Sequence, residues 1–144
     1  MVPTLTLSIG DELFVARLRW DLAPRSCERL LALLPYKGDV VHARWSGEAL
    51  WSPLTLVWRR QSFLVQENAT QCPKPGEIPL YAGELSEPGL LIPYGACSFA
   101  SQAGPLEGNP VLFIEEGAAR LDGLGADILR RGALKLSLSI SPRL

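Results

Sequence analysis

The stretch TLTLSIGDELFVARLRW (residues 4–20) decides the fold class of this chain. Apolar and polar side chains alternate on both sides of Gly10-Asp11, a residue pair typical of a tight turn. Because successive side chains of a strand point to opposite faces, each half of the stretch gathers its apolar residues on one face. These residues are Leu5, Leu7 and Ile9, then Phe14, Ala16, Leu18 and Trp20. The pattern predicts an antiparallel hairpin.

A short amphipathic helix is predicted to follow the hairpin. Pro24 suits the first turn of a helix, because the N–H that proline lacks would have no partner there. Pro35 ends the helix, because its ring clashes with the preceding turn. We therefore expect a helix over Pro24–Leu34 whose apolar stripe faces a sheet. The stripe consists of Cys27, Leu30, Leu31 and Leu34.

The rest of the chain is predicted to form short strands, two loops and one more helix. The helix is expected over Ala118–Arg131, because apolar residues recur there at helical spacing and Gly132 is a stop signal. Its stripe would consist of Leu121, Leu124, Ile128 and Leu129. Loops are expected over residues 67–76 and 98–109, where polar or small residues and prolines gather. Strands are expected over residues 40–46, 54–58, 63–65, 77–81, 90–94, 111–115 and 134–140.

Many short strands without a regular alternation of strand and helix argue against a doubly wound sheet. A closed, mostly antiparallel barrel with helices over its open ends accounts best for this order. Pro79 and Pro93 place their strands near an edge or a bulge, because proline has no N–H for a sheet ladder. We therefore predict a mainly β chain in which residues 1–144 form a single domain.

The composition of the 144-residue chain excludes several classes of function. Its 14 basic and 15 acidic side chains give a net charge of −1 without a basic block, so we expect no nucleic-acid partner. No apolar run reaches the roughly 18 residues of a membrane-spanning helix, and we recognise no signal peptide. The three cysteines are isolated and one histidine is present, so we expect reduced thiols in the cytoplasm, no metal and no other cofactor.

Polar chemistry is concentrated in HARWSGEALW (residues 42–51), which holds the histidine and two of the four tryptophans. Two β-branched valines precede it, so its first half is predicted to be a strand. The expected core face carries Val41, Ala43 and Trp45, and the opposite face carries His42, Arg44 and Ser46. That opposite face would present a base, a fixed cation and a hydroxyl in one direction.

Several motifs resemble those of the cyclophilin-like barrels, in particular those of a small bacterial cyclophilin-like family of unknown function. They are APRSCE (23–28), residues 42–51, ENAT (67–70), PGEI (75–78) with Tyr81, YGA (94–96), FAS (99–101), and Gly104 with LEGN (106–109). These motifs run across most of the chain. The resemblance implies an eight-stranded barrel capped by two helices, in a family without a settled activity.

The resemblance also implies a groove on the outer face of the barrel, where cyclophilins isomerise X-Pro bonds. Arg44 is similar in place to an arginine that serves in that groove. Other parts of the groove have no counterpart, because no glycine- and glutamine-containing segment follows Trp51 and residues 84–94 replace an asparagine-rich stretch. The tryptophan and histidine of the last part of the groove are also absent, so we expect little or no prolyl isomerase activity.

Five residues are candidates for ligand binding: His42, Arg44, Trp51, Glu77 and Tyr81. Arg44 either binds a carboxylate or carbonyl, or forms a structural ion pair with Glu48 or Glu77. His42 is either a general base or, as we favour, a hydrogen-bonded structural histidine. Glu77 and Tyr81 share a strand face, where they either meet a ligand or form a cross-strand hydrogen bond.

The leading hypothesis is a barrel that binds a small molecule or short peptide in the groove at Arg44. The alternative is an enzyme on the same groove, either a prolyl isomerase or an acid–base catalyst that uses His42 or Glu77. Residues 90–92 are apolar and flanked by prolines, which predicts an exposed edge that pairs with a second copy in a homodimer or larger homo-oligomer. The competing interpretation is an edge that the loop 98–109 covers.

Overall fold

In the computed structural model, which describes residues 3–58 and 64–142, the N-terminal hairpin has the predicted arrangement. β1 (Thr4–Ile9) and β2 (Glu12–Leu18) pair antiparallel, and Ile9 lies opposite Glu12. The two residues between the strands form the turn. Gly10 adopts a φ of 58° there, a left-handed conformation that glycine takes without steric cost.

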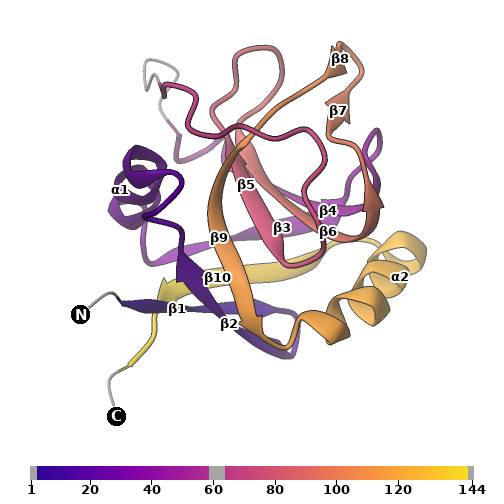
Figure 1. The fold of residues 1–144 in the computed structure, drawn as a ribbon. Helices are drawn as coiled ribbons and strands as arrows, with labels where there is room; N and C mark the ends of the chain where they lie inside the picture. Colours follow the sequence, from indigo (N-terminus) through magenta and orange to yellow (C-terminus); the bar gives the residue numbers. More distant parts are fainter. Residues whose placement is uncertain (1–2, 59–63, 143–144) are drawn as a thin grey trace.

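Eight strands close into a barrel in the order β1-β10-β3-β4-β6-β5-β9-β2, and all neighbouring pairs are antiparallel (Figure 1). The predicted mainly β barrel is therefore confirmed. The other barrel strands are β3 (Tyr36–His42), β4 (Gly47–Pro53), β5 (Glu77–Tyr81), β6 (Gly89–Cys97), β9 (Asn109–Glu116) and β10 (Leu134–Ile140). A separate two-stranded sheet consists of β7 (Ala100–Ser101) and β8 (Gly104–Pro105), within the segment predicted as a loop.

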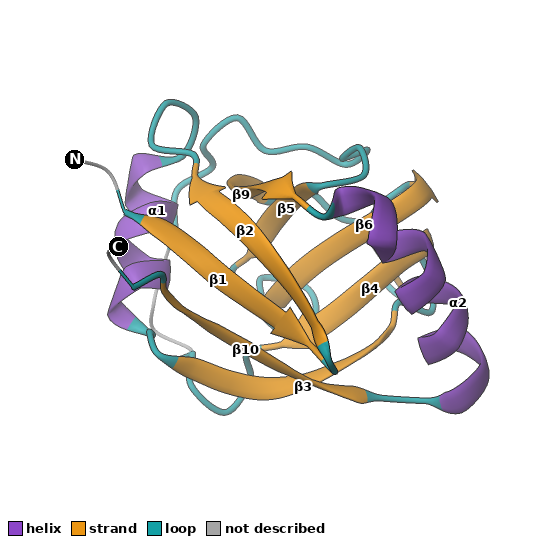
Figure 2. Cartoon of the chain, turned by 90° about the horizontal axis from the view of Figure 1, so that it is seen from below, coloured by secondary structure: helices purple, strands orange, loops and turns teal. Residues whose placement is uncertain are grey.

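The two helices lie at opposite ends of the barrel, as predicted (Figure 2). α1 (Pro24–Ala32) ends before Leu34, because a residue that precedes proline is disfavoured in the α conformation. A 3₁₀ turn (Ala118–Arg120) leads into α2 (Leu121–Arg131), so this segment matches the predicted range.

The apolar stripes of both helices pack into the core with one exception. Cys27, Leu30, Leu121, Leu124 and Ile128 are buried there, and Leu31 and Leu34 pack partly buried against them. The prediction for Leu129 is wrong, because this side chain is 63% exposed. One residue past Ile128 turns a helical side chain by about 100°, which carries it out of the core.

The wall of the barrel has two apolar faces, and the site lies on the outer one. On β6, Leu90 and Ile92 point into the main core, whereas Leu91 belongs to a second apolar cluster. β4 and β5 alternate in the same way. This second cluster consists of Ala43, Ala49, Tyr81, Leu91, Phe99 and Leu106, with Trp51 and Cys97 packed against it. The segment that follows β6 covers this outer face with Phe99 and Leu106.

Residues 90–92 do not form the exposed edge that the sequence predicted. β6 lies between β4 and β5 in the closed barrel, and Leu90, Leu91 and Ile92 are at most 1% exposed. The argument for a homodimer through this segment therefore does not hold. The prolines instead lie at bulges, since the pairing register shifts beside Pro79 and, between β4 and β6, next to Pro93.

Two predicted strands are absent from the described residues. Residues 54–58 form a turn after β4, with N–H groups of Val57 and Trp58 donating back to the carbonyl of Leu54. In the predicted strand 63–65, Phe63 lies outside the described residues, and Leu64 and Val65 are in irregular structure. Aromatic and β-branched residues favour strands only weakly, and tertiary context decides.

The strand that enters the site ends four residues earlier than predicted. β3 stops at His42, and residues 43–46 form the connection to β4. Val40 is the residue that points into the core, so Val41 faces outward and is 37% exposed. The predicted core position of Trp45 is wrong, because its side chain is 55% exposed, whereas Ala43 is buried as predicted.

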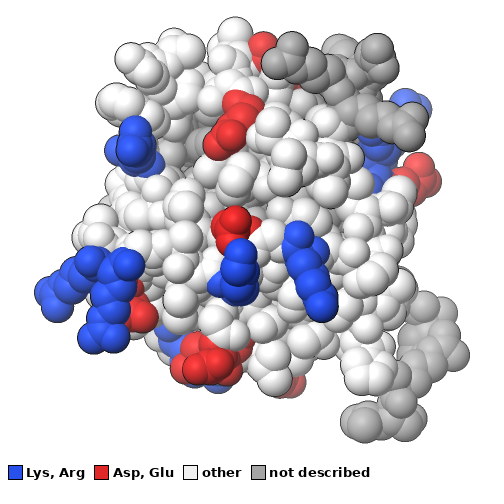
Figure 3. Space-filling view, turned by 180° about the vertical axis from the view of Figure 1, so that it is seen from behind, with Lys and Arg blue, Asp and Glu red and all other residues white. Residues whose placement is uncertain are grey.

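The surface of the protein carries charges of both signs. On the face drawn in Figure 3, acidic and basic side chains are interspersed without a continuous field of one sign. Within residues 3–58 and 64–142, no helix has the length and apolar character needed to cross a membrane. The same residues contain no group of three His, Cys, Asp or Glu side chains arranged to hold a metal ion.

Candidate functional site

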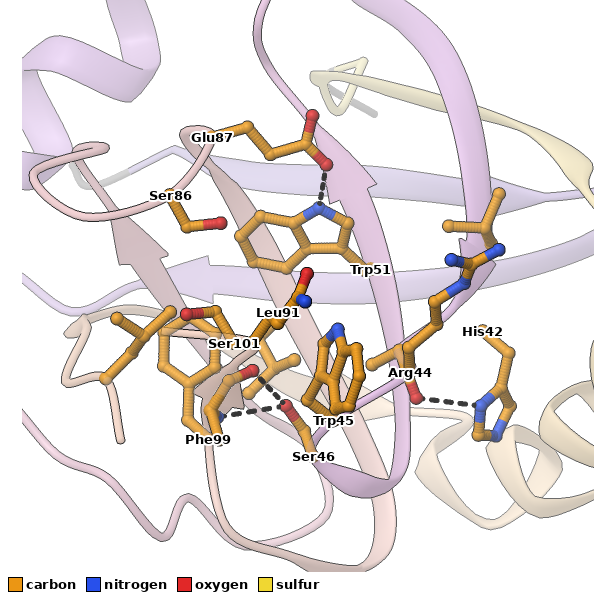
Figure 4. A pocket seen from close by; sticks show the side chains of 15 residues that line it. His42, Arg44, Trp45, Ser46, Trp51, Ser86, Glu87, Leu91, Phe99 and Ser101 are labelled. Atoms are coloured by element: carbon orange, nitrogen blue, oxygen red, sulfur yellow. Dashed lines mark hydrogen bonds between the residues drawn. The ribbon is translucent and has the colours of Figure 1, made fainter. Parts of the chain in front are cut away.

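A pocket of about 470 Å³ lies over the outer apolar cluster (Figure 4). The β3–β4 connection forms one wall, the segment after β6 forms another, and residues just before β6 form the rim. The lining residues are Val41, His42, Ala43, Arg44, Trp45, Ser46, Trp51, Ser86, Glu87, Leu91, Phe99, Ala100, Ser101, Gln102 and Leu106. Three of the five predicted ligand-binding residues therefore meet at this pocket.

Ser46 fixes the two walls of the pocket to each other. Its hydroxyl donates to the carbonyl of Ala100 and accepts from the N–H of Ala100, both at 3.2 Å. The N–H of Ser98 donates to the carbonyl of Ser46 at 3.0 Å. Ser46 is buried, so it holds the scaffold of the pocket, whereas the sequence pattern placed it on the binding face.

Trp51 lines the pocket as predicted, and its indole is held from two sides. The indole N–H donates to Glu87 at 2.8 Å, and the ring lies 5.7 Å from the Phe99 ring between centroids. Thr55 donates to the second oxygen of the Glu87 carboxylate at 3.2 Å. Glu87 was not foreseen, because a single glutamate in a loop before β6 carries no motif.

Trp45 also lines the pocket, and the sequence interpretation missed it. The alternation argument assigned this indole to the core because it extended the strand through residue 46. Gly47, with a φ of 89° at the start of β4, is the signal that could have corrected this assignment. A glycine after three polar or aromatic residues, here Arg44, Trp45 and Ser46, is typical of a connection between strands. Two indoles from different elements thus face one pocket (Figure 4).

Arg44 is exposed in the pocket wall, and the predicted structural ion pairs do not form. Among the described residues, no carboxylate oxygen lies within 4.0 Å of its guanidinium. The Glu48 carboxylate instead accepts from the N–H of Ala96 at 2.9 Å. The Glu77 carboxylate accepts from the N–H of Lys74 at 2.7 Å. The guanidinium therefore keeps its donors available to a ligand.

Both ring nitrogens of His42 are engaged in hydrogen bonds. Nδ1 lies 3.1 Å from the carbonyl oxygen of Ala43, and Nε2 lies 2.8 Å from the hydroxyl of Tyr94. Because a carbonyl only accepts, Nδ1 carries the proton of the neutral ring, and Nε2 accepts from Tyr94. This arrangement corresponds to the structural histidine that the sequence analysis favoured.

Glu77 and Tyr81 are not among the residues that line the pocket. They share the outer face of β5, as predicted, but four residues of strand separate them by roughly 13 Å. Tyr81 is only 2% exposed, accepts from the N–H of Leu85, and packs edge-on against Phe99. It therefore supports the pocket floor from below, whereas Glu77 lies at the other end of the strand.

The cysteines do not supply an activated nucleophile. Burial raises the pKa of the Cys97 thiol to about 11 and that of the Cys27 thiol to about 12. A thiol with such a pKa is protonated at neutral pH, and the thiolate is the reactive form. Cys72 is exposed and lies outside the pocket lining.

Comparison with known proteins shows the fold and the family. No curated protein matches the chain. The structure of McbB in complex with tryptophan is similar, with a TM-score of 0.76 and 17% identity over 97% of this chain and 45% of McbB. This chain thus spans less than half the length of McbB.

A second solved structure is similar over almost its whole length. The hypothetical protein AF2241 from Archaeoglobus fulgidus has a TM-score of 0.57 and 10% identity, over 97% of this chain and 95% of that chain. At such identities these likenesses concern the fold alone. Residues 5–140 match the family described as "Protein of unknown function (DUF3830)", and the chain belongs to this DUF3830 family.

Proposed function

We propose that this protein binds a small molecule or short peptide in the outer pocket, with Arg44 as the anchor for a carboxylate or carbonyl group. One observation carries the proposal: Arg44, without an ionic partner among the described residues, lies beside two indoles over an apolar floor. A volume of about 470 Å³ suits a small ligand, and such a mixture of apolar walls and few polar groups is typical of ligand sites.

Each group of the pocket has a clear chemical use. The planar guanidinium of Arg44 offers a pair of parallel donors that match the two oxygens of a carboxylate. Trp45 and Trp51 offer large apolar surfaces that lose few rotamers on binding. Leu91 and Phe99 form a floor from which a ligand displaces water.

A relation to the cyclophilin-like barrels belongs to the same proposal. The pocket is on the outer face of the barrel and includes Arg44, as that resemblance implies. McbB, which shares the fold over 45% of its length, was determined in complex with tryptophan, and this is consistent with a small-molecule ligand for the present protein. A bacterial origin and a cytoplasmic location are also part of the proposal, on the strength of the sequence alone.

An enzyme on the same groove has less support. A general base needs a free lone pair toward the substrate, and the hydrogen bond from Tyr94 occupies that of His42. Glu77 does not line the pocket. The binding hypothesis requires neither residue to react.

A thermal-shift screen of amino acids, dipeptides, amides and organic acids tests the proposal. A ligand at 100 times its dissociation constant stabilises the protein by about 2.7 kcal/mol, which is readily measured. Arg44→Ala should abolish the shift given by carboxylates, and Arg44→Lys should restore it only in part. Arg130→Ala is the matched control, because Arg130 is exposed on α2 outside the pocket. Shifts that persist in Arg44→Ala, or a panel without a single shift, would contradict the proposal.

A further inference from the structure

Glu87 gives the proposed binding pocket a second charge, opposite to that of Arg44. Among the described residues that line the pocket, these two alone carry a full formal charge at neutral pH. The carboxylate of Glu87, like the guanidinium of Arg44, has no ionic partner within 4.0 Å among those residues. The pocket thus contains one unpaired cation and one unpaired anion, which do not pair with each other.

The Glu87 carboxylate is oriented by neutral donors. One oxygen accepts from the indole N–H of Trp51 and the other from the hydroxyl of Thr55. A carboxylate has about four lone-pair sites, so each oxygen retains one for a further donor. Figure 4 shows Glu87 above the Trp51 indole and Arg44 on another side of that ring. The negative charge is therefore held at the rim with capacity for a cationic group.

From this juxtaposition we infer the class of ligand, and the inference rests on the proposed function of the pocket. The ligand is a zwitterion with an apolar body: a free amino acid or a short peptide with a free amino terminus. Its carboxylate pairs with Arg44, its ammonium group pairs with Glu87, and its apolar side chain lies against Trp45, Trp51 and the floor at Leu91. A ligand with a single charge would pair with only one of these two side chains. It would displace water from the other side chain without supplying an opposite charge in its place.

Three compounds that share a phenyl ring distinguish the contributions of the two charges to binding. Phenylalanine has both, 3-phenylpropanoate lacks the ammonium group, and 2-phenylethylamine lacks the carboxylate. Phenylalanyl-glycine places the two charges further apart and so distinguishes an amino-acid ligand from a peptide ligand. Dissociation constants are measured by isothermal titration calorimetry at neutral pH for the full chain, for Arg44→Ala and for Glu87→Gln. The amide introduced by Glu87→Gln keeps a carbonyl oxygen that accepts from Trp51, so the variant changes mainly the charge.

The tighter of the two zwitterions should bind the unmodified protein at least tenfold more tightly than either singly charged compound. Glu87→Gln should remove its advantage over 3-phenylpropanoate, and Arg44→Ala should remove its advantage over 2-phenylethylamine. Glu84→Gln is the control, because Glu84 is an exposed carboxylate of the same loop outside this pocket. This variant should change neither the affinity of the zwitterion relative to 3-phenylpropanoate nor its affinity relative to 2-phenylethylamine.

Two contrary results are distinguishable. If 3-phenylpropanoate binds as tightly as the zwitterions in an Arg44-dependent way, and Glu87→Gln changes nothing, the zwitterion inference is overturned while the proposed carboxylate site stands. If none of the four compounds binds, or if binding survives Arg44→Ala undiminished, the inference falls together with the proposed function.

Discussion

The carboxylate of Glu67 accepts two hydrogen bonds from Ser26, one from its backbone N–H and one from its hydroxyl, each 2.8 Å long. The N–H of Arg25 donates to the second carboxylate oxygen at 3.0 Å. These donors lie in the first turn of α1, where N–H groups lack partners within the helix. The N-cap residue, Ala23, has no side-chain acceptor, so Glu67 caps the helix from a loop 41 residues away.

Glu67→Gln should therefore destabilise the protein at neutral pH. The amide keeps one acceptor oxygen but loses the negative charge beside the positive end of the helix dipole. Loss of a helix cap costs about 1 kcal/mol, and denaturant unfolding monitored by circular dichroism would measure it. Glu107→Gln is a suitable control, since Glu107 is an exposed carboxylate in a different loop, whereas Glu67 is half-buried. Equal stability of Glu67→Gln and the unmodified protein would refute the capping role.

The difference in unfolding free energy between the unmodified protein and Glu67→Gln should depend on pH with a definite sign. Burial raises the pKa of the Glu67 carboxyl, but hydrogen bonds from Arg25 and Ser26 outweigh it and hold the pKa below its usual 4.5. A carboxyl whose pKa is lower in the folded state stabilises that state above the unfolded pKa, and the stabilisation is lost as the pH falls through the folded value. The difference between the two proteins should thus be constant above about pH 6 and shrink below the usual pKa. A difference that grows on acidification would contradict this assignment.

Two glycines of α2 should respond to alanine in opposite directions. At Gly125, an added Cβ would lie closer than 3.0 Å to the ring of Tyr94, whereas at Gly123 nothing lies within 4 Å. Gly123→Ala should stabilise the protein by up to about 1 kcal/mol, because alanine favours helix. Gly125→Ala should destabilise it by about 1–3 kcal/mol, because the Tyr94 ring must move and its bond to His42 is strained.

A double substitution checks the cause at Gly125. In a Tyr94→Ala background the Gly125→Ala change should lose most of its cost, since the two side chains no longer compete for space. Thermal or denaturant unfolding of the four proteins gives the coupling energy. Additive effects would show that Tyr94 is not the obstacle.

His42→Gln should leave ligand affinity within about twofold of the unmodified protein. The histidine ring bonds to Ala43 and Tyr94, and it contributes to the pocket wall without an unpaired nitrogen. The expected cost is about 1 kcal/mol of stability, the net contribution of a hydrogen bond.

A proline-peptide isomerisation assay of the unmodified protein should give little or no activity. Isomerase activity that disappears on Arg44→Ala would instead favour the enzyme hypothesis.

The thiols should react in the order of their exposure. Iodoacetamide at pH 8 should label Cys72 first, because this thiol is exposed. Burial raises the pKa of Cys97 to about 11, so roughly one molecule in a thousand carries its thiolate at that pH. Peptide mass spectrometry over time gives the rates, and Cys72→Ser should remove the fast phase. Labelling of Cys97 as fast as that of a free thiol would indicate an activated nucleophile.

Much of the fold could be predicted because it is encoded locally. The alternation around Gly10-Asp11 and the helical spacing from Leu121 to Ile128 each lie within one short segment. The end of β3 was missed, because alternation continues formally through residue 46 while the chain has already turned, and Gly47 is the one local signal of the connection. Whether Leu90–Ile92 lie at an edge depends on strand neighbours that come from distant parts of the sequence.

The residues of the site likewise fall into those that the sequence alone could reveal and those that it could not. His42, Arg44 and Trp51 could be found because all three lie within one short stretch, residues 42–51, that is unusually rich in polar and aromatic side chains. Glu87 could not be found, since its importance comes from the Trp51 indole 36 residues earlier. The capping role of Glu67 is hidden for the same reason, because its partners lie on α1.

Indole N–H resonances test the central claim most directly. The chain has four tryptophans, of which Trp45 and Trp51 line the pocket, whereas Trp20 and Trp58 do not. A ¹H–¹⁵N spectrum, assigned with single Trp→Phe variants, is recorded during titration with the tightest-binding carboxylate of the screen. The resonances of Trp45 and Trp51 should move while those of Trp20 and Trp58 stay, and Arg44→Ala should abolish the movement. Stationary Trp45 and Trp51 resonances, or shifts of the same size in Arg44→Ala, would contradict ligand binding at this pocket.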